Sequence, residues 1–201
     1  PNSAASNLAI MYKLHGPSYS IATACASSNN AMIETYKGIL LGEYDVALTG
    51  GTEAAICRLG MAGFGAMSAL SKHNEYPEKA SRPFDKDHNG FVMGEGAGVF
   101  VFEELEHAKK RGAQIFGEVV GYGVTTDASD LTQPDVLGTY ASEAMKATLR
   151  SAKWNPSDVD YINAHGTATI LGDDAEVAAI KSAFGDDAAK VSISSTKSSI
   201  G

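Results

Sequence analysis

The sequence predicts an α/β fold in which helices cover a β-sheet. Segments with apolar residues at helical spacing alternate along the chain with short runs of β-branched and aromatic residues. The chain has 201 residues, 44% of them hydrophobic, which is enough to bury a sizeable core. No clean linker interrupts the alternation, and we place a division into two parts, residues 1–104 and 105–201, at the start of segment 105–117.

The helices are predicted from their apolar faces and from the residues at their ends. The first is followed by Gly42, and glycine is typical of helix C-termini. The last carries acidic residues in its first turn, where they favour the helix dipole, and it precedes Gly185. The predicted helices span residues 26–41, 105–111, 139–152 and 173–184.

The strands are predicted where β-branched and apolar residues cluster between turn residues. The segment 96–103 contains the run VFVF, and 115–125 shows an alternating pattern. Residues 52–89 are predicted to be the irregular part of the chain. The predicted strands span residues 18–23, 45–49, 96–103, 115–125, 159–163 and 191–194.

Charge and composition exclude several classes of protein. With 16 Lys and Arg against 24 Asp and Glu, the net charge of -8 argues against nonspecific nucleic-acid binding. The two cysteines, Cys25 and Cys57, exclude a disulfide-rich scaffold and a Cys-x-x-Cys zinc site. No apolar run approaches the ~18 residues of a membrane span, so we expect a soluble intracellular protein. Because it begins at Pro1 and ends in a Ser/Gly-rich turn, we expect an internal piece of a longer chain.

One acidic run resembles half of a calcium-binding loop. Residues 85–90 (DKDHNG) match the start of an EF-hand, but position twelve is Gly96 and Glu95 comes one residue early. We therefore predict a turn whose Asp side chains cap their own backbone. Four histidines in polar surroundings are expected to be solvated: His15, His73, His88 and His107.

Cys25 is the candidate nucleophile. It follows a predicted strand and stands at the start of a predicted helix. The partial positive charge of a helix N-terminus lowers a thiol pKa from its usual ~8.5, and the free N–H groups there stabilise an oxyanion. The alternative is a buried structural cysteine, the more common fate of a lone Cys. Cys57 has no such placement and is predicted to be a core residue.

Two further polar residues each follow a predicted strand. His165 stands in a Gly/Thr loop, and a histidine at a strand end of an α/β fold can donate or accept a proton in catalysis. Lys197 lies among serines and could organise a carbonyl site. The alternative for His165 is a histidine that hydrogen-bonds the backbone of its own loop, and the alternative for Lys197 is a solvated side chain. Asp173 and Glu176 favour the helix dipole, or they pair with Lys197.

Several segments together resemble the β-ketoacyl-acyl carrier protein synthases of the thiolase superfamily, most of all the β-ketoacyl synthase II type. TACASS at 23–28 is similar to the nucleophile segment of that family. SRPFD at 81–85 and GFVMGEGAG at 90–98 resemble two framework segments. NAHGT at 163–167 resembles the first catalytic His motif, and SSTKS at 194–198 resembles the Lys motif. The resemblance covers essentially the whole chain.

The resemblance implies a condensation mechanism. An acyl group passes from acyl carrier protein to Cys25, malonyl-carrier protein loses carbon dioxide, and the enolate attacks the acyl thioester. His165 would stabilise the enolate oxygen or assist decarboxylation. Lys197, paired with Glu176 and Asp173, would organise the catalytic histidines. The Cys25 N–H would form half of an oxyanion hole.

The resemblance also implies the architecture and the partners. The fold would be the layered α/β/α/β/α thiolase-like fold, incomplete because both ends are expected to be truncated. Residues 1–104 would belong to the N-terminal half and 105–201 to the C-terminal half. Acyl carrier protein in acyl and malonyl forms would be the partner, and a homodimer would form through the strand from Ser18 to Thr23. No metal or cofactor is expected beyond the phosphopantetheine of the carrier, nor any nucleic acid or membrane, and the compartment would be the cytoplasm or an organelle stroma.

The sequence also departs from the family pattern. The second catalytic His and the Gly-Phe-Gly segment of the family would lie after Gly201, so the 201 residues alone are expected to lack full activity. Ile170 stands where the family usually has Pro. A ketosynthase of a polyketide or polyunsaturated-lipid system remains an alternative. A non-catalytic partner subunit that sets chain length is a second one, against which the presence of Cys25, His165 and Lys197 argues.

Overall fold

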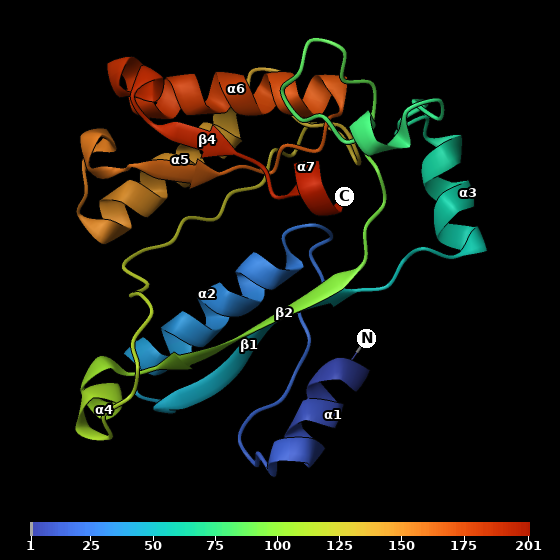
Figure 1. Ribbon diagram of the computed structural model, residues 1–201. Coiled ribbons are helices and arrows are strands. Elements are labelled where there is room, and N and C mark those ends of the chain that lie inside the picture. The colour runs from blue at the N-terminus through green and yellow to red at the C-terminus, as the bar shows by residue number, and fades with distance from the viewer. Residues whose placement is uncertain (1) are drawn as a thin grey trace. The chain divides into compact units, whose positions relative to one another are not determined.

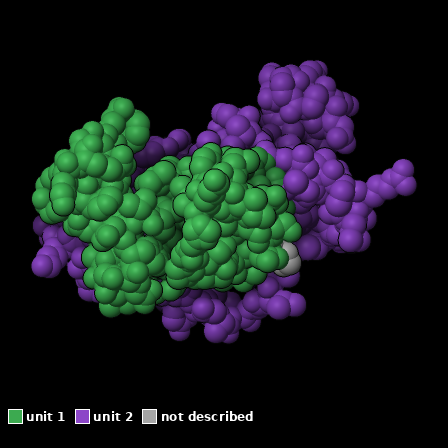
Figure 2. All heavy atoms as spheres, turned by 90° about the horizontal axis from the view of Figure 1, so that it is seen from below, with its two compact units in different colours: residues 1–53, 96–119 green, residues 54–95, 120–201 purple. Residues whose placement is uncertain are grey.

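The computed structural model describes residues 2–201, which divide into two compact units. Among these residues, one unit consists of 2–53 and 96–119, and the other of 54–95 and 120–201. Figure 2 colours the first unit green and the second purple. The chain therefore passes from the first unit to the second and back before it completes the second.

The first unit is built on an antiparallel pair of strands covered by a helix. β1 pairs with β2 from Val46 opposite Glu103 to Glu53 opposite Gly96. α2 packs along this pair, chiefly against β1 (Figure 1). Gly51 permits the close approach, because a Cβ there would lie 2.3 Å from the Ser28 hydroxyl. The elements of this unit are α1 (Ser3–Tyr12), α2 (Ser27–Leu40), β1 (Val46–Glu53), β2 (Gly96–Glu103) and α4 (Leu105–Lys110).

The second unit contains a parallel strand pair joined by a helix. β3 and β4 pair in parallel with Ile162 opposite Ile193, and α6 connects them. α5 packs against α6 (Figure 1). The core of this unit forms around Ile180 and Phe184 of α6, against which Met145 of α5 packs. The helices and strands of this unit are α3 (Arg58–Ala66), α5 (Thr139–Ala152), β3 (Tyr161–Asn163), α6 (Ile170–Phe184), β4 (Ser192–Ser194) and α7 (Lys197–Ile200), with 3-10 turns at Pro77–Lys79, Pro156–Asp158 and Gly185–Ala189.

The parallel pairing of β3 and β4 positions the candidate site. Both strands run in the same direction, so the segments that follow them leave the same edge of the pair. The N–H of Ala164 donates to the Ser194 carbonyl at 2.8 Å, which continues the pairing beyond β3. The loop that carries His165 therefore lies beside the segment that leads to Lys197.

Two predicted strands are wrong. Residues 18–23 contain no strand beyond an isolated bridge between Thr23 and Cys25, and 115–125 form no strand among the described residues. Part of the second segment lies on α5 instead, where Cβ atoms at Gly121 and Gly123 would clash with the helix backbone. Composition indicates that a segment tolerates an extended backbone, whereas a strand also requires a partner with which to pair.

Other boundaries also differ from the prediction. The segment predicted to be irregular contains α3, and α1 and the short α7 were not predicted. α6 begins at Ile170, three residues earlier than expected. In the part of the chain that the structure describes, no helix combines the length and the apolar character needed to cross a membrane.

Candidate active site

The loop that carries His165 is held by Glu176, two turns into α6. The N–H groups of His165 and Gly166 donate to the two carboxylate oxygens of Glu176, each at 2.7 Å. Charge-assisted hydrogen bonds of this kind are stronger than those between neutral groups. Both bonds act on the backbone, so Glu176 fixes the loop and leaves the imidazole of His165 available.

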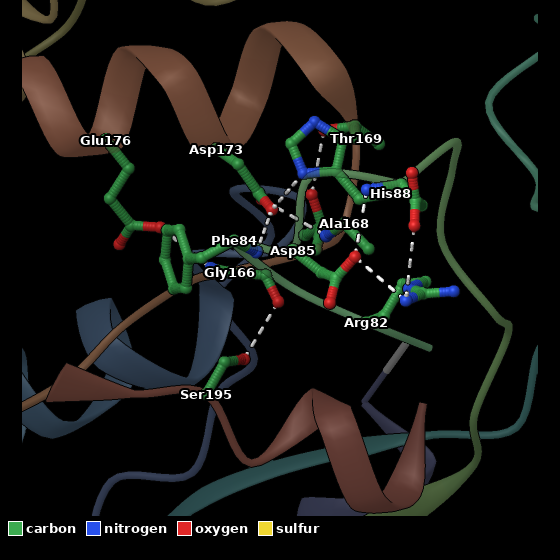
Figure 3. A network of polar contacts seen from close by, with 12 residues as sticks. Arg82, Phe84, Asp85, His88, Gly166, Ala168, Thr169, Asp173, Glu176 and Ser195 are labelled. Atoms are coloured by element: carbon green, nitrogen blue, oxygen red, sulfur yellow. Dashed lines mark hydrogen bonds and ion pairs between the residues drawn. The ribbon is translucent and has the colours of Figure 1, made fainter. Parts of the chain in front are cut away.

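Asp173 binds the same loop one turn earlier in α6. Its side chain is only 1% exposed, and a buried carboxylate requires hydrogen bonds to offset the lost hydration. One carboxylate oxygen accepts the Ala168 N–H at 3.1 Å, and the other accepts the Phe84 N–H at 2.6 Å. His88 Nδ1 lies 3.3 Å from that second oxygen. Figure 3 shows Asp173 between these groups.

Ser195 joins the His165 loop to the segment that carries Lys197. Its buried hydroxyl donates to the Gly166 carbonyl at 2.8 Å (Figure 3). The same hydroxyl accepts the Lys197 N–H at 3.2 Å. The Ser81 hydroxyl donates to the Lys197 carbonyl. Gly166 has a φ of 41°, and a Cβ there would lie 2.6 Å from the Ser195 Cβ. The His165 loop and the Lys197 segment therefore pack so closely that only glycine fits at position 166.

The electrostatic environment favours a neutral His165. Surrounding protein atoms lower its pKa by desolvation, even though the residue as a whole is exposed to solvent. The positive charge of Lys197 lowers this pKa further, while Glu176 and Asp173 act in the opposite direction. A neutral imidazole has one donor and one acceptor nitrogen, so it can hydrogen-bond a carbonyl or enolate oxygen at neutral pH.

The prediction of an ion pair between Lys197 and Glu176 is wrong. Within residues 2–201, Lys197 forms no ion pair, and both oxygens of Glu176 are bound to backbone N–H groups. Asp173 likewise bonds to the backbone and faces His88, not Lys197. The two acids hold the loop, and Lys197 acts on His165 through its charge.

Cys25 belongs to the first unit, where it lies in a tight turn just before α2. Ala24 has a φ of 49°, a conformation that costs energy in any residue except glycine. The turn is closed by the Ser27 hydroxyl, which accepts the Thr23 N–H at 2.9 Å and donates to the Ala24 carbonyl at 2.7 Å. Cys25 is a free, exposed thiol two residues ahead of the helix, so its predicted position beside a helix start agrees with the structure, whereas the strand predicted before it is not formed in the described residues.

Two residues lie elsewhere than the sequence predicted. Cys57 is exposed, not part of the core, and its sulfur accepts the Gly60 N–H at 3.4 Å as the N-cap of α3. His88 is not solvated, because its side chain is 13% exposed and faces Asp173. The sequence carries no signal for this contact, since the two residues are far apart in the chain.

The acidic run forms the predicted turn, in which Asp85 accepts the Asp87 N–H at 2.8 Å and pairs with Arg82.

Comparison with known proteins identifies the family. Residues 1–108 match the model of the beta-ketoacyl synthase N-terminal domain, and residues 116–201 match that of the C-terminal domain. The chain belongs to the β-ketoacyl synthase family. The thiolase-like α/β fold predicted from the resemblance is therefore confirmed.

Curated relatives that are similar to this chain are named 3-oxoacyl-[acyl-carrier-protein] synthases. The 3-oxoacyl-[acyl-carrier-protein] synthase 2 of Rhizobium meliloti is 50% identical over 201 residues, which are 100% of this chain and 48% of the relative. The chloroplastic 3-oxoacyl-[acyl-carrier-protein] synthase I of Arabidopsis thaliana is 50% identical over 194 residues, covering 96% and 41%. The chain thus spans about half the length of the curated relatives it matches.

Solved structures agree with this membership. A beta-ketoacyl synthase from Burkholderia phymatum superposes with a TM-score of 0.94 at 38% identity, covering 100% of this chain and 48% of that one. A type II polyketide ketosynthase, solved with its acyl-carrier protein and bound to the hexaketide, gives a TM-score of 0.97 at 36% identity, covering 100% and 49%.

Proposed function

We propose that the protein containing this chain condenses an acyl thioester with malonyl-acyl carrier protein to extend a fatty acid by two carbons. The observation that carries the proposal is the locked arrangement of the His165 loop beside the Lys197 segment. The curated relatives that match the whole chain at about half identity are named 3-oxoacyl-[acyl-carrier-protein] synthases, which adds support. The protein would accordingly be an acyltransferase.

In the first step, the Cys25 thiolate attacks the carbonyl carbon of an acyl thioester on the carrier. The carbonyl oxygen becomes an oxyanion, and the N–H of Cys25, in the turn before α2, would bind it. The carrier thiol leaves and takes a proton, which conserves the proton lost from Cys25. The product is an acyl group bound to the Cys25 sulfur.

In the second step, malonyl-carrier protein loses carbon dioxide, and the electrons of the broken bond form an enolate. A neutral His165 donates a hydrogen bond to the thioester oxygen as negative charge develops there, which lowers the barrier. The lowered pKa of His165 supports this role. The enolate carbon then attacks the acyl-Cys25 carbonyl, and the Cys25 thiolate leaves.

The partners and the compartment follow from the same proposal. Acyl carrier protein would deliver both substrates on its phosphopantetheine, and a solved neighbour binds its own acyl-carrier protein. The reaction would use no metal or further cofactor. We propose a homodimer that forms through residues 18–23, in the cytoplasm or an organelle stroma.

A polyketide ketosynthase is the second candidate. The similarity to the hexaketide-bound ketosynthase favours it, and further solved neighbours are ketosynthases paired with chain length factors. A non-catalytic chain-length subunit would not need Cys25, so its presence in a preformed turn argues for a catalytic role.

The test uses the full-length protein with acyl- and malonyl-carrier protein, and mass spectrometry to detect the product. We expect a β-ketoacyl product two carbons longer, whose formation is lost in Cys25→Ala and retained in Cys57→Ala. Unchanged condensation in Cys25→Ala would overturn the proposal. Repeated extension without reduction, instead of a single round, would support the polyketide function.

A further inference from the structure

His88 faces a buried carboxylate that touches the candidate site. Its Nδ1 is buried and lies 3.3 Å from Asp173, close enough for an ion pair, although the ring is not aligned for a hydrogen bond. Within residues 2–201, no Lys or Arg pairs with Asp173. A buried carboxylate without a cation depends strongly on each of its partners, so His88 is placed to decide how firmly Asp173 is held.

Asp173 in turn connects two loops. It binds the N–H of Phe84 from one loop and that of Ala168 from the other. Both donors have a positive φ, 62° and 65°, which non-glycine residues adopt only when surrounding contacts hold them there. A second link, from the Gly90 N–H to the Ala168 carbonyl at 2.8 Å, joins the same loops. The backbone of the His165 loop is therefore strained and depends on Asp173 for its shape.

We propose that His88 is a positioning residue for the decarboxylation step, because it fixes Asp173 and, through Asp173, the loop that presents His165 (Figure 3). The inference rests on the proposed function, since it concerns the same site. His88 itself does not contact the reacting atoms.

The structure predicts which step depends on His88. The turn that presents Cys25 is closed by hydrogen bonds among its own residues, Thr23, Ala24 and Ser27. Acylation of Cys25 should therefore proceed without His88. Decarboxylation uses His165, so it should be slowed when His88 is removed.

The experiment measures both steps in the full-length protein: acyl-enzyme formation by mass, and carbon dioxide release from malonyl-carrier protein. His88→Leu keeps roughly the volume and removes the polar atom that faces Asp173, whereas His88→Asn keeps a polar group near the Nδ1 position. We expect His88→Leu to slow carbon dioxide release by about tenfold or more, since small misplacements of a catalytic group have such effects. Acylation should stay within about twofold, and His88→Asn should recover most of the rate.

His73→Leu is the matched control. The His73 ring contacts the Asp87 carbonyl in the same loop at 3.2 Å, without touching Asp173, so its loss should leave both rates unchanged. Unchanged carbon dioxide release in His88→Leu would overturn the proposal. The proposal would also be overturned if both variants, His88→Leu and His88→Asn, slowed acylation and carbon dioxide release to the same extent.

A second variant covers the case in which His88→Leu does not fold. Asp173→Asn keeps the shape of the side chain and removes its charge, and it should slow carbon dioxide release while sparing acylation; equal rates in wild type and this variant would overturn the proposal. If the wild-type protein neither acylates Cys25 nor releases carbon dioxide, the proposed function fails first and the role of His88 fails with it. If only the proposed role of His88 is wrong, the wild-type protein still acylates Cys25 and releases carbon dioxide.

Discussion

Replacing Gly166 by Ala should destabilise the second unit and disrupt the His165 loop. The new Cβ would lie 2.6 Å from the Ser195 Cβ and 2.9 Å from the Phe84 ring, so one of them must move. Overpacking of this kind costs about 1–3 kcal/mol. The φ of 41° adds about 1 kcal/mol for a residue with a side chain. We expect a total loss of about 2–4 kcal/mol in the free energy of unfolding.

Urea unfolding of the full-length protein measures this loss. Gly42→Ala is the control, because Gly42 has a φ of 70° and a Cβ there would meet nothing within 4 Å in the described structure. It should lose only about 1 kcal/mol, the conformational part alone. Carbon dioxide release should also fall in Gly166→Ala, since Ser195 cannot move without shifting the Lys197 segment. Equal losses in the two variants would refute the steric argument.

Two further predictions concern charge. Glu103 is bound by Arg111 and His107, which lower its pKa to about 2, so the interaction stabilises the fold above about pH 4.5 and is lost as the pH falls toward 2. Arg111→Met should therefore lower the urea midpoint at pH 7 and have little effect near pH 2; a midpoint loss that is the same at both values would contradict this. Lys197 lowers the pKa of His165, so Lys197→Met should raise that pKa and move the acid limb of the pH–rate profile for carbon dioxide release to higher pH. A limb that stays in place or moves to lower pH would contradict the assignment.

The sequence predicted those elements whose signals are local. The helix 139–152 and the strand 96–103 coincide with α5 and β2, because helical spacing and β-branched runs reflect the residues of the segment itself. Residues 18–23 and 115–125 carry similar composition but form no strands among the described residues. Strand formation depends on a partner that composition does not specify.

The candidate site was predicted in part for the same reason. The positions of His165 and Lys197 after parallel strands follow from local patterns together with the connection through α6. The contacts within the site do not follow from local patterns, because backbone N–H groups compete with charged side chains for the carboxylates. Glu176 binds two of them and so does not pair with Lys197, and Asp173 meets His88 only because the chain folds back on itself.

Mass analysis of peptides from the full-length protein shows whether Cys25 carries the acyl group. After incubation with an acyl-carrier thioester, we expect the acyl mass on the peptide that contains Cys25 and none on the peptide that contains Cys57. Addition of malonyl-carrier protein should then remove that mass and yield the β-ketoacyl product. Absence of acyl-Cys25, or equal labelling of both cysteines, would show that Cys25 is not the nucleophile.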